Sequence, residues 1–227
     1  MTKPQSETAD SEGGPPPVDL TPSEPFASGR TVGRLCLDTC VIIGINNRER
    51  FIADEQASLD QLLRLRREAI VELVMTGTAW VERGGLNPDE QAWARRLETA
   101  GMIMLHDPYV EGHSAPETSV QPSPDDEARF STVLRIVHPR ALRRDTPGDN
   151  DLRDAMHIAT AIRYGSEGLV TTDSDVLRAK AGIATCFAGF QLMLPSEAVA
   201  WVEQRRAASV RTQRALEELR RRLDLGE

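Results

Sequence analysis

Short apolar runs rich in β-branched residues alternate along the chain with segments whose apolar residues recur at helical spacing. Such runs predict strands buried on both faces of a sheet. The first run, Arg34–Ile45, is interrupted by an acid, and we expect its strand to end at Asp38–Thr39. The other expected strands are 69–75, 101–106, 168–172 and 190–194. The expected helices are 54–67, 78–83, 87–100, 125–137, 151–165, 174–181 and a long one from 196 towards 222.

Strands that alternate with helices predict a parallel sheet covered by helices. We therefore expect an α/β domain over residues 33–195, with three α/β/α layers and a central, mainly parallel five-stranded sheet. Residues 1–32 are rich in proline and acids, which predicts a disordered tail. The connection over residues 107–126 is longer than most connections in compact domains. It predicts an inserted loop, which is either a functional lid or a disordered segment. Residues 196–227 are expected to form a C-terminal helix.

The composition of the chain indicates which classes of protein are compatible with the sequence. The chain has 227 residues and a formal net charge of −8, which argues against coating nucleic acid but suits a nuclease that gathers acids around metal ions. Its longest apolar runs are too short to span a membrane, and its N-terminus lacks a secretory pattern. Three cysteines without a CxxC pair are typical of a reduced protein, so we expect a cytoplasmic location.

Three acids fall at or near the expected carboxyl ends of strands, where open α/β sheets bind ligands. Asp38 ends the first strand, Asp173 follows the fourth, and Asp154 is expected in the first turn of the helix before the fourth strand. Two carboxylates about 4 Å apart repel by roughly 4 kcal/mol at an effective dielectric near 20. If the three converge, they favour a hard divalent cation, Mg²⁺ or Mn²⁺, and the lack of Cys/His ligand spacing disfavours zinc. Such a site suits phosphodiester hydrolysis.

Each acid also has a structural interpretation. Asp38 is compatible with a buried ion pair, and Asp173 with Asp175 could cap the helix that follows. Asp154 could complement a helix dipole, together with Asp149 and Asp151.

Four segments together resemble the PIN-domain ribonucleases, most closely the VapC-type toxins of bacteria. The segments are LDTCVII, TAWVERGGL, DAMHIATAIRYG and LVTTDSDVL, and the resemblance spans about Leu35–Leu194. It implies a metal-dependent endoribonuclease whose catalytic acids are Asp38, Glu82, Asp154 and Asp173. It further implies that Asp38, Asp154 and Asp173 hold Mg²⁺ or Mn²⁺ while Glu82 positions the metal or the attacking water. RNA would be the substrate, and an antitoxin protein would be a partner.

Several residues keep two interpretations. Glu72 is the alternative to Glu82, and His157 is expected to support the site by packing or one hydrogen bond rather than to act in catalysis. A cluster of arginines before Asp149 has a physical basis for binding phosphate. Its members are Arg140, Arg143 and Arg144. The arginines of the last helix are typical of a solvated face, with a partner surface or a homodimer as the alternative.

Two other functions compete with the ribonuclease hypothesis. A non-catalytic PIN-like module could use the same pocket to bind RNA or a protein, although the complete set of acids disfavours it. An aspartyl-phosphate phosphatase or receiver-type protein fits poorly, because Asp38 lacks the paired D-x-D of such phosphatases.

Overall fold

The computed structural model describes residues 31–46, 51, 53–82, 102–108, 110, 113–114, 118–141 and 147–224. Its centre is a five-stranded sheet in the order β3-β2-β1-β6-β7, in which every neighbouring pair is parallel. The strands are β1 (Arg34–Leu37), β2 (Glu72–Thr76), β3 (Ile103–Leu105), β6 (Gly168–Val170) and β7 (Gln191–Met193). The expected five-stranded parallel sheet is therefore confirmed.

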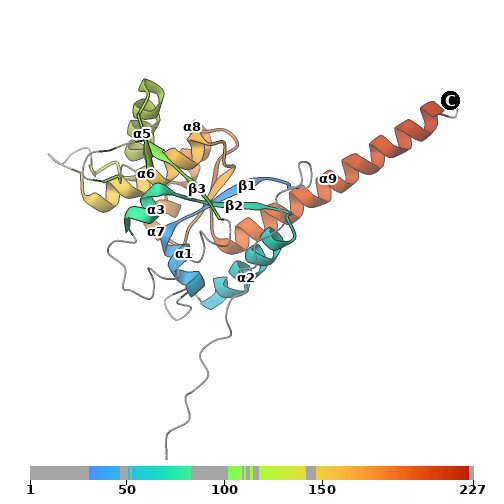
Figure 1. Cartoon of the computed structure of the whole chain (residues 1–227), viewed down its shortest axis with the longest axis horizontal. Helices are drawn as coiled ribbons and strands as arrows, with labels where there is room; N and C mark the ends of the chain where they lie inside the picture. The colour runs from blue at the N-terminus through green and yellow to red at the C-terminus, as the bar shows by residue number, and fades with distance from the viewer. Residues whose placement is uncertain are drawn as a thin grey trace, which may run out of the picture.

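One face of the sheet packs against α1 (Thr39–Asn46), α2 (Ala53–Arg67) and the first turns of α9 (Pro195–Asp224). Successive side chains of a strand point to opposite faces. Leu35 and Leu37 of β1 accordingly join this layer, where they meet the leucines of α2 and Val202 of α9. The three helices lie together on one side of the sheet (Figure 1).

The other face packs against α5 (Pro124–Val137), α6 (Asp149–Arg163), α7 (Ser174–Leu177) and α8 (Lys180–Cys186). Along each strand, the residues that alternate with those of the first face point into this layer, and Cys36 of β1 and Val74 of β2 are examples. The structure is thus a three-layer α/β/α domain, with one apolar core on each side of the sheet.

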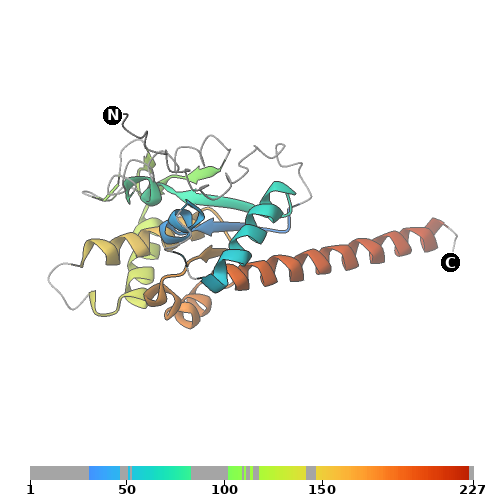
Figure 2. The ribbon, with the colours of Figure 1, turned by 90° about the horizontal axis from the view of Figure 1, so that it is seen from below.

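The helix α9 leaves the body of the protein as a single straight rod (Figures 1 and 2). Residues 204–222 are exposed along its whole length, which corresponds to about 28 Å of helix beyond the core. The long C-terminal helix predicted from Ser196 is confirmed.

The sequence prediction was wrong in three places. The strand ends within a residue or two of the expected Asp38–Thr39, but the apolar residues that follow form α1, a helix that was not predicted because a short buried apolar run has no periodicity that identifies a helix. The segment expected as one helix over 174–181 divides into α7 and α8. The helix α6 begins at Asp149, which places Asp154 in its second turn and not in its first.

The remaining expectations concern segments that the structure describes in part. Residues 107–126 include a short parallel pair, β4 (Asp107–Pro108) and β5 (Ser119–Val120), before α5 begins. A short helix, α3 (Gly77–Glu82), stands close to its expected position. The expected helix at 87–100 and residues 1–30 of the expected tail at 1–32 lie outside the described residues.

Candidate functional site at the carboxyl edge of the sheet

The strand order creates a switch point beside β1. The chain proceeds from β1 to β2 and β3 on one side, and the later strands β6 and β7 are added on the other side. In open α/β sheets ligands bind at the carboxyl ends of the strands at such a point. Polar side chains occupy this edge: Thr76 ends β2, Asp38 follows β1, and Thr171 follows β6.

Asp38 is nearly buried, with 7% of its surface exposed, and its carboxylate accepts three hydrogen bonds. Its Oδ1 accepts from the backbone N–H of Thr39 at 2.7 Å. Its Oδ2 accepts from the hydroxyl of Thr171 at 2.5 Å and from the thiol of Cys40 at 3.2 Å. Neighbouring segments from both sides of the switch point therefore fix this carboxylate in one orientation.

His157 of α6 joins the helical layer to the sheet edge. Its ring is 1% exposed, and Nδ1 lies 2.6 Å from the hydroxyl of Thr76. Its Nε2 lies 3.2 Å from Oε2 of Glu82 and 3.2 Å from the hydroxyl of Thr39, and that hydroxyl also donates to Glu82. The same nitrogen is 3.8 Å from Oδ1 of Asp38. The network connects Glu82 to the edge that carries Asp38.

The charges of the residues in this network change the pKa values of His157 and Glu82. Burial by itself would lower the pKa of His157, but its hydrogen bond to Glu82 and the charges of Glu82, Asp38 and Asp107 raise that pKa to about 9. Burial would raise the pKa of Glu82, but the hydrogen bond and charge of His157, with Thr39, lower it instead. At neutral pH the pair is therefore an imidazolium beside a carboxylate.

Asp154 is held by a histidine at the end of the neighbouring helix in the same layer. Nε2 of His138, which follows α5, lies 2.9 Å from Oδ2 of Asp154, and Nδ1 lies 3.3 Å from Oδ1 of Asp151. The pKa of Asp154 is raised by burial and by the negative charges of Asp38 and Asp173, while His138 acts in the opposite direction. Asp154 therefore interacts electrostatically with both of the other predicted acids.

Asp173 precedes α7 and caps it. Its Oδ1 accepts from the backbone N–H groups of Asp175 at 2.7 Å and Val176 at 3.3 Å. The capping interpretation of Asp173 is therefore correct, and it uses one carboxylate oxygen. The charge of Asp173 also raises the pKa of His138, after the larger effect of the hydrogen bond to Asp154, which places Asp173 in the same electrostatic environment.

The donor set at this edge fits a hard divalent cation in its chemistry. Asp38, Asp154 and Asp173 supply oxygen only, and the raised pKa of Asp154 reflects a repulsion that a cation would relieve. In the described ranges, however, no three His, Cys, Asp or Glu side chains stand in an arrangement that could hold a metal ion. Asp154 is turned towards His138, and Asp173 towards the first turn of α7.

The structure shows where Glu72, Asp149 and Asp151 lie relative to the acidic edge. Glu72 forms an ion pair with Arg34, and these two residues are in register at the amino ends of β2 and β1. Glu72 therefore lies at the opposite edge of the sheet from Asp38. Asp149 is exposed at the first turn of α6, whereas Asp151 accepts from the backbone N–H of Gly148 at 3.2 Å and so caps that helix.

The sequence analysis assigned no role to several polar residues of this edge. Thr39, Thr76 and Thr171 stand directly at strand ends, and this position is a signal that could have found them. Asp107 was assigned to a loop but is fully buried next to β3, where its Oδ2 accepts from Thr78 at 2.9 Å. His138 carries no signal in the sequence, because its contact with Asp154 depends on how α5 packs against α6.

Comparison with known proteins adds no family. No protein-family model matches the sequence, and no curated protein matches it significantly. Among the helices that the structure describes, none has both the length and the apolar composition that a membrane crossing requires.

Proposed function

We propose that the protein is a metal-dependent endoribonuclease of the PIN type, which hydrolyses phosphodiester bonds of RNA. The observation that supports it most is the electrostatic coupling of Asp154 with Asp38 and Asp173 at the switch point of the sheet. Burial makes such a cluster of carboxylates costly unless a cation offsets it, and a functional site is where that cost is retained.

In this proposal Asp38, Asp154 and Asp173 would hold Mg²⁺ or Mn²⁺. Bound to carboxylates, such an ion supplies activation of water and neutralisation of charge on a phosphate. Glu82 stays ionised because its pKa is lowered, so its carboxylate is able to accept a hydrogen bond from the attacking water. His157 positions Glu82 through its contact at 3.2 Å, and its positive charge offsets part of the negative charge of the acids.

The biological setting rests on the resemblance. We place the protein in the cytoplasm as a toxin that an antitoxin protein neutralises, and its free cysteines, Cys36, Cys40 and Cys186, are in keeping with a reducing compartment. A small antitoxin gene beside its own gene would support this setting.

A second candidate is a non-catalytic module that binds RNA or a protein. The hydrogen bonds that occupy Asp154 and Asp173 favour it, because both carboxylates already have protein partners. Calorimetric titration with Mn²⁺ discriminates between the two candidates, since this module has no need of a metal ion.

The test of the proposed function is cleavage of labelled RNA in Mg²⁺ or Mn²⁺, followed on gels. We expect Asp38→Asn and Asp154→Asn each to abolish cleavage, because each substitution removes a charged ligand while nearly keeping its shape. Asp149→Asn is the matched control, since Asp149 is an exposed acid on the same helix as Asp154. Circular dichroism verifies that the variants fold. Wild-type activity in Asp38→Asn or Asp154→Asn contradicts the proposal.

A further inference from the structure

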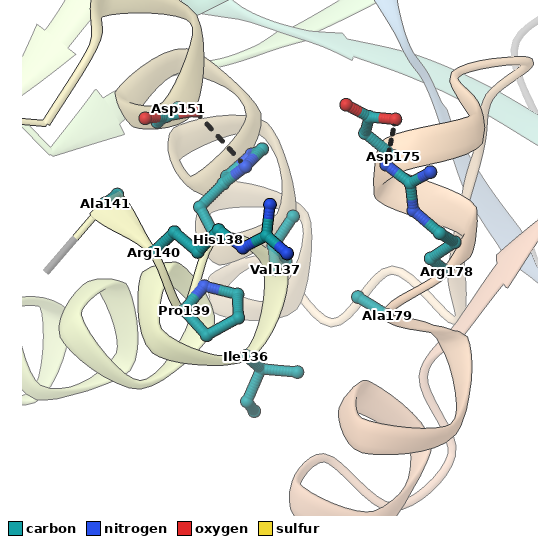
Figure 3. A pocket seen from close by; sticks show the side chains of 10 residues that line it. All are labelled: Ile136, Val137, His138, Pro139, Arg140, Ala141, Asp151, Asp175, Arg178 and Ala179. Atoms are coloured by element: carbon teal, nitrogen blue, oxygen red, sulfur yellow. Dashed lines mark hydrogen bonds and ion pairs between the residues drawn. The ribbon is translucent and has the colours of Figure 1, made fainter. Parts of the chain in front are cut away.

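A pocket between α5 and α7 borders the acidic edge. It has a volume of about 620 Å³, within the range of roughly 300–1,000 Å³ that is usual for ligand sites. One wall is the end of α5 with the turn after it, and the other is α7 with the residues that follow (Figure 3). The described polar residues that line it are His138, Arg140, Asp151, Asp175 and Arg178.

Two arginines stand on opposite walls of this pocket. Arg140 lies in the turn after α5, and Arg178 directly follows α7 (Figure 3). Within the described part of the chain, the guanidinium of Arg140 makes no hydrogen bond or ion pair. Arg178 pairs with Asp175 at an exposed position, where an ion pair contributes only about 0–1 kcal/mol. A guanidinium has five N–H donors, so Arg178 keeps donors for a further anion.

The same pocket is connected to the acids by direct contacts. His138 lines the pocket and lies 2.9 Å from Asp154. On the other wall, the backbone N–H of Asp175, which also lines the pocket, donates to Asp173 at 2.7 Å. The pocket thus adjoins two of the predicted metal ligands, and the same pocket contains both arginines. A nucleic-acid strand bound at the acids would continue into this pocket.

We propose that Arg140 and Arg178 form a phosphate-binding subsite that holds the RNA strand at least one nucleotide away from the bond that is cut. The inference rests on the proposed function, because it assigns a role to the pocket beside the same acids. Guanidinium groups suit this role, since their planar donors match two phosphate oxygens at once. Contacts to phosphate position a strand without reading its sequence.

A binding experiment tests this subsite without cleavage. Labelled single-stranded RNA is titrated with the full chain in EDTA, and anisotropy gives the affinity from 50 to 200 mM salt. Each phosphate contact steepens the dependence of log affinity on log salt by about 0.7 for a single strand. We expect Arg140→Gln/Arg178→Gln to make the slope shallower by about 1.4. Over that salt range the wild type should lose about sevenfold more affinity than the variant.

The matched control is Arg135→Gln/Arg214→Gln, which removes the same charge from two exposed arginines outside the pocket. This control should keep the wild-type slope. In Mg²⁺ or Mn²⁺, the pocket variant should raise KM for RNA and leave kcat nearly unchanged, because the proposal assigns neither arginine to the reacting phosphate.

The outcomes separate the subsite from the nuclease. A shallower slope in the pocket variant alone supports the subsite, even if the wild type fails to cleave RNA and the proposed function falls. An unchanged slope in a protein that cleaves RNA overturns the subsite and leaves the nuclease standing. Equal losses of slope in the pocket and control variants mean general attraction to positive charge, and they overturn the subsite. Absence of RNA binding by the wild type overturns it as well.

Discussion

Asp107 gives the sharpest test of the electrostatics at this edge. Its side chain is fully buried, and burial raises its pKa to about 6, although the charge of His157 and the hydrogen bond from Thr78 act in the opposite direction. The perturbation is Asp107→Asn, which keeps an acceptor for Thr78 and removes the titration. Since the pKa of His157 is about 9, the imidazolium stays charged throughout the relevant pH window.

The magnitude follows from linkage. The pKa of Asp107 is about 6 in the folded protein against 3.8 as its ordinary value, a difference that corresponds to about 3 kcal/mol. The folded protein holds this proton more tightly than the unfolded chain, so the wild type loses stability as pH rises from about 4 to 6. Between pH 4.5 and 7.5 the loss is about 2 kcal/mol. At pH values well above the pKa of Asp107 in the folded protein, the loss of stability has reached its full value.

Urea unfolding of both proteins at pH 4.5, 6 and 7.5 measures the effect. We expect the free energy of unfolding of Asp107→Asn, relative to the wild type, to increase by about 2 kcal/mol from the lowest to the highest pH. Any cost of placing the amide is independent of pH and cancels in this comparison. Asp149→Asn, at an exposed position, should show no such trend. A difference between Asp107→Asn and wild type that stays constant with pH refutes the reasoning.

Two further predictions concern a bound metal and the start of α5. Mg²⁺ or Mn²⁺ at 100 times its dissociation constant should stabilise the protein by about 2.7 kcal/mol, or roughly 5–10 °C in Tm. Calorimetry should show this gain shrinking in acid, as protons compete, and in Asp154→Asn. Asp126 accepts hydrogen bonds from Ser123, Arg129 and Arg163, so Asp126→Ala should cost about 2–4 kcal/mol in urea unfolding. Its exposed neighbour Glu127, changed to Ala, should cost far less, and equal costs would contradict the assignment.

The sequence predicted the sheet and most of its helices because burial leaves a local pattern. Strands such as β6 are buried on both faces and read as apolar runs, whereas helices such as α2 carry leucines at helical spacing. The helix α1 was missed because eight residues that are mostly buried give no amphipathic period. The start of α6 was missed because a glycine, Gly148, stands at its N-cap, where the sequence offers no capping side chain.

The site was predictable only as far as strand ends mark it. Asp38 interrupts an apolar run of the sequence, so its chemistry is visible there. The partners that orient the acids were hidden, because they come from distant segments: 118 residues separate Thr39 from His157, and 133 separate Asp38 from Thr171. Arg178 was hidden for the same reason, since only the packing of the two walls places it opposite Arg140.

The contacts of Asp154 explain how a repelling cluster persists in a folded domain. Its carboxylate is partly buried and lies near the charges of Asp38 and Asp173, and both effects favour protonation. His138 counters them through one hydrogen bond, and the same ring contacts Asp151. A cation bound by the three acids would take over this compensation, and His138 would then compete with it for one oxygen of Asp154. The histidine therefore stabilises the ionised form of Asp154, and it also lines the pocket that contains Arg140 and Arg178.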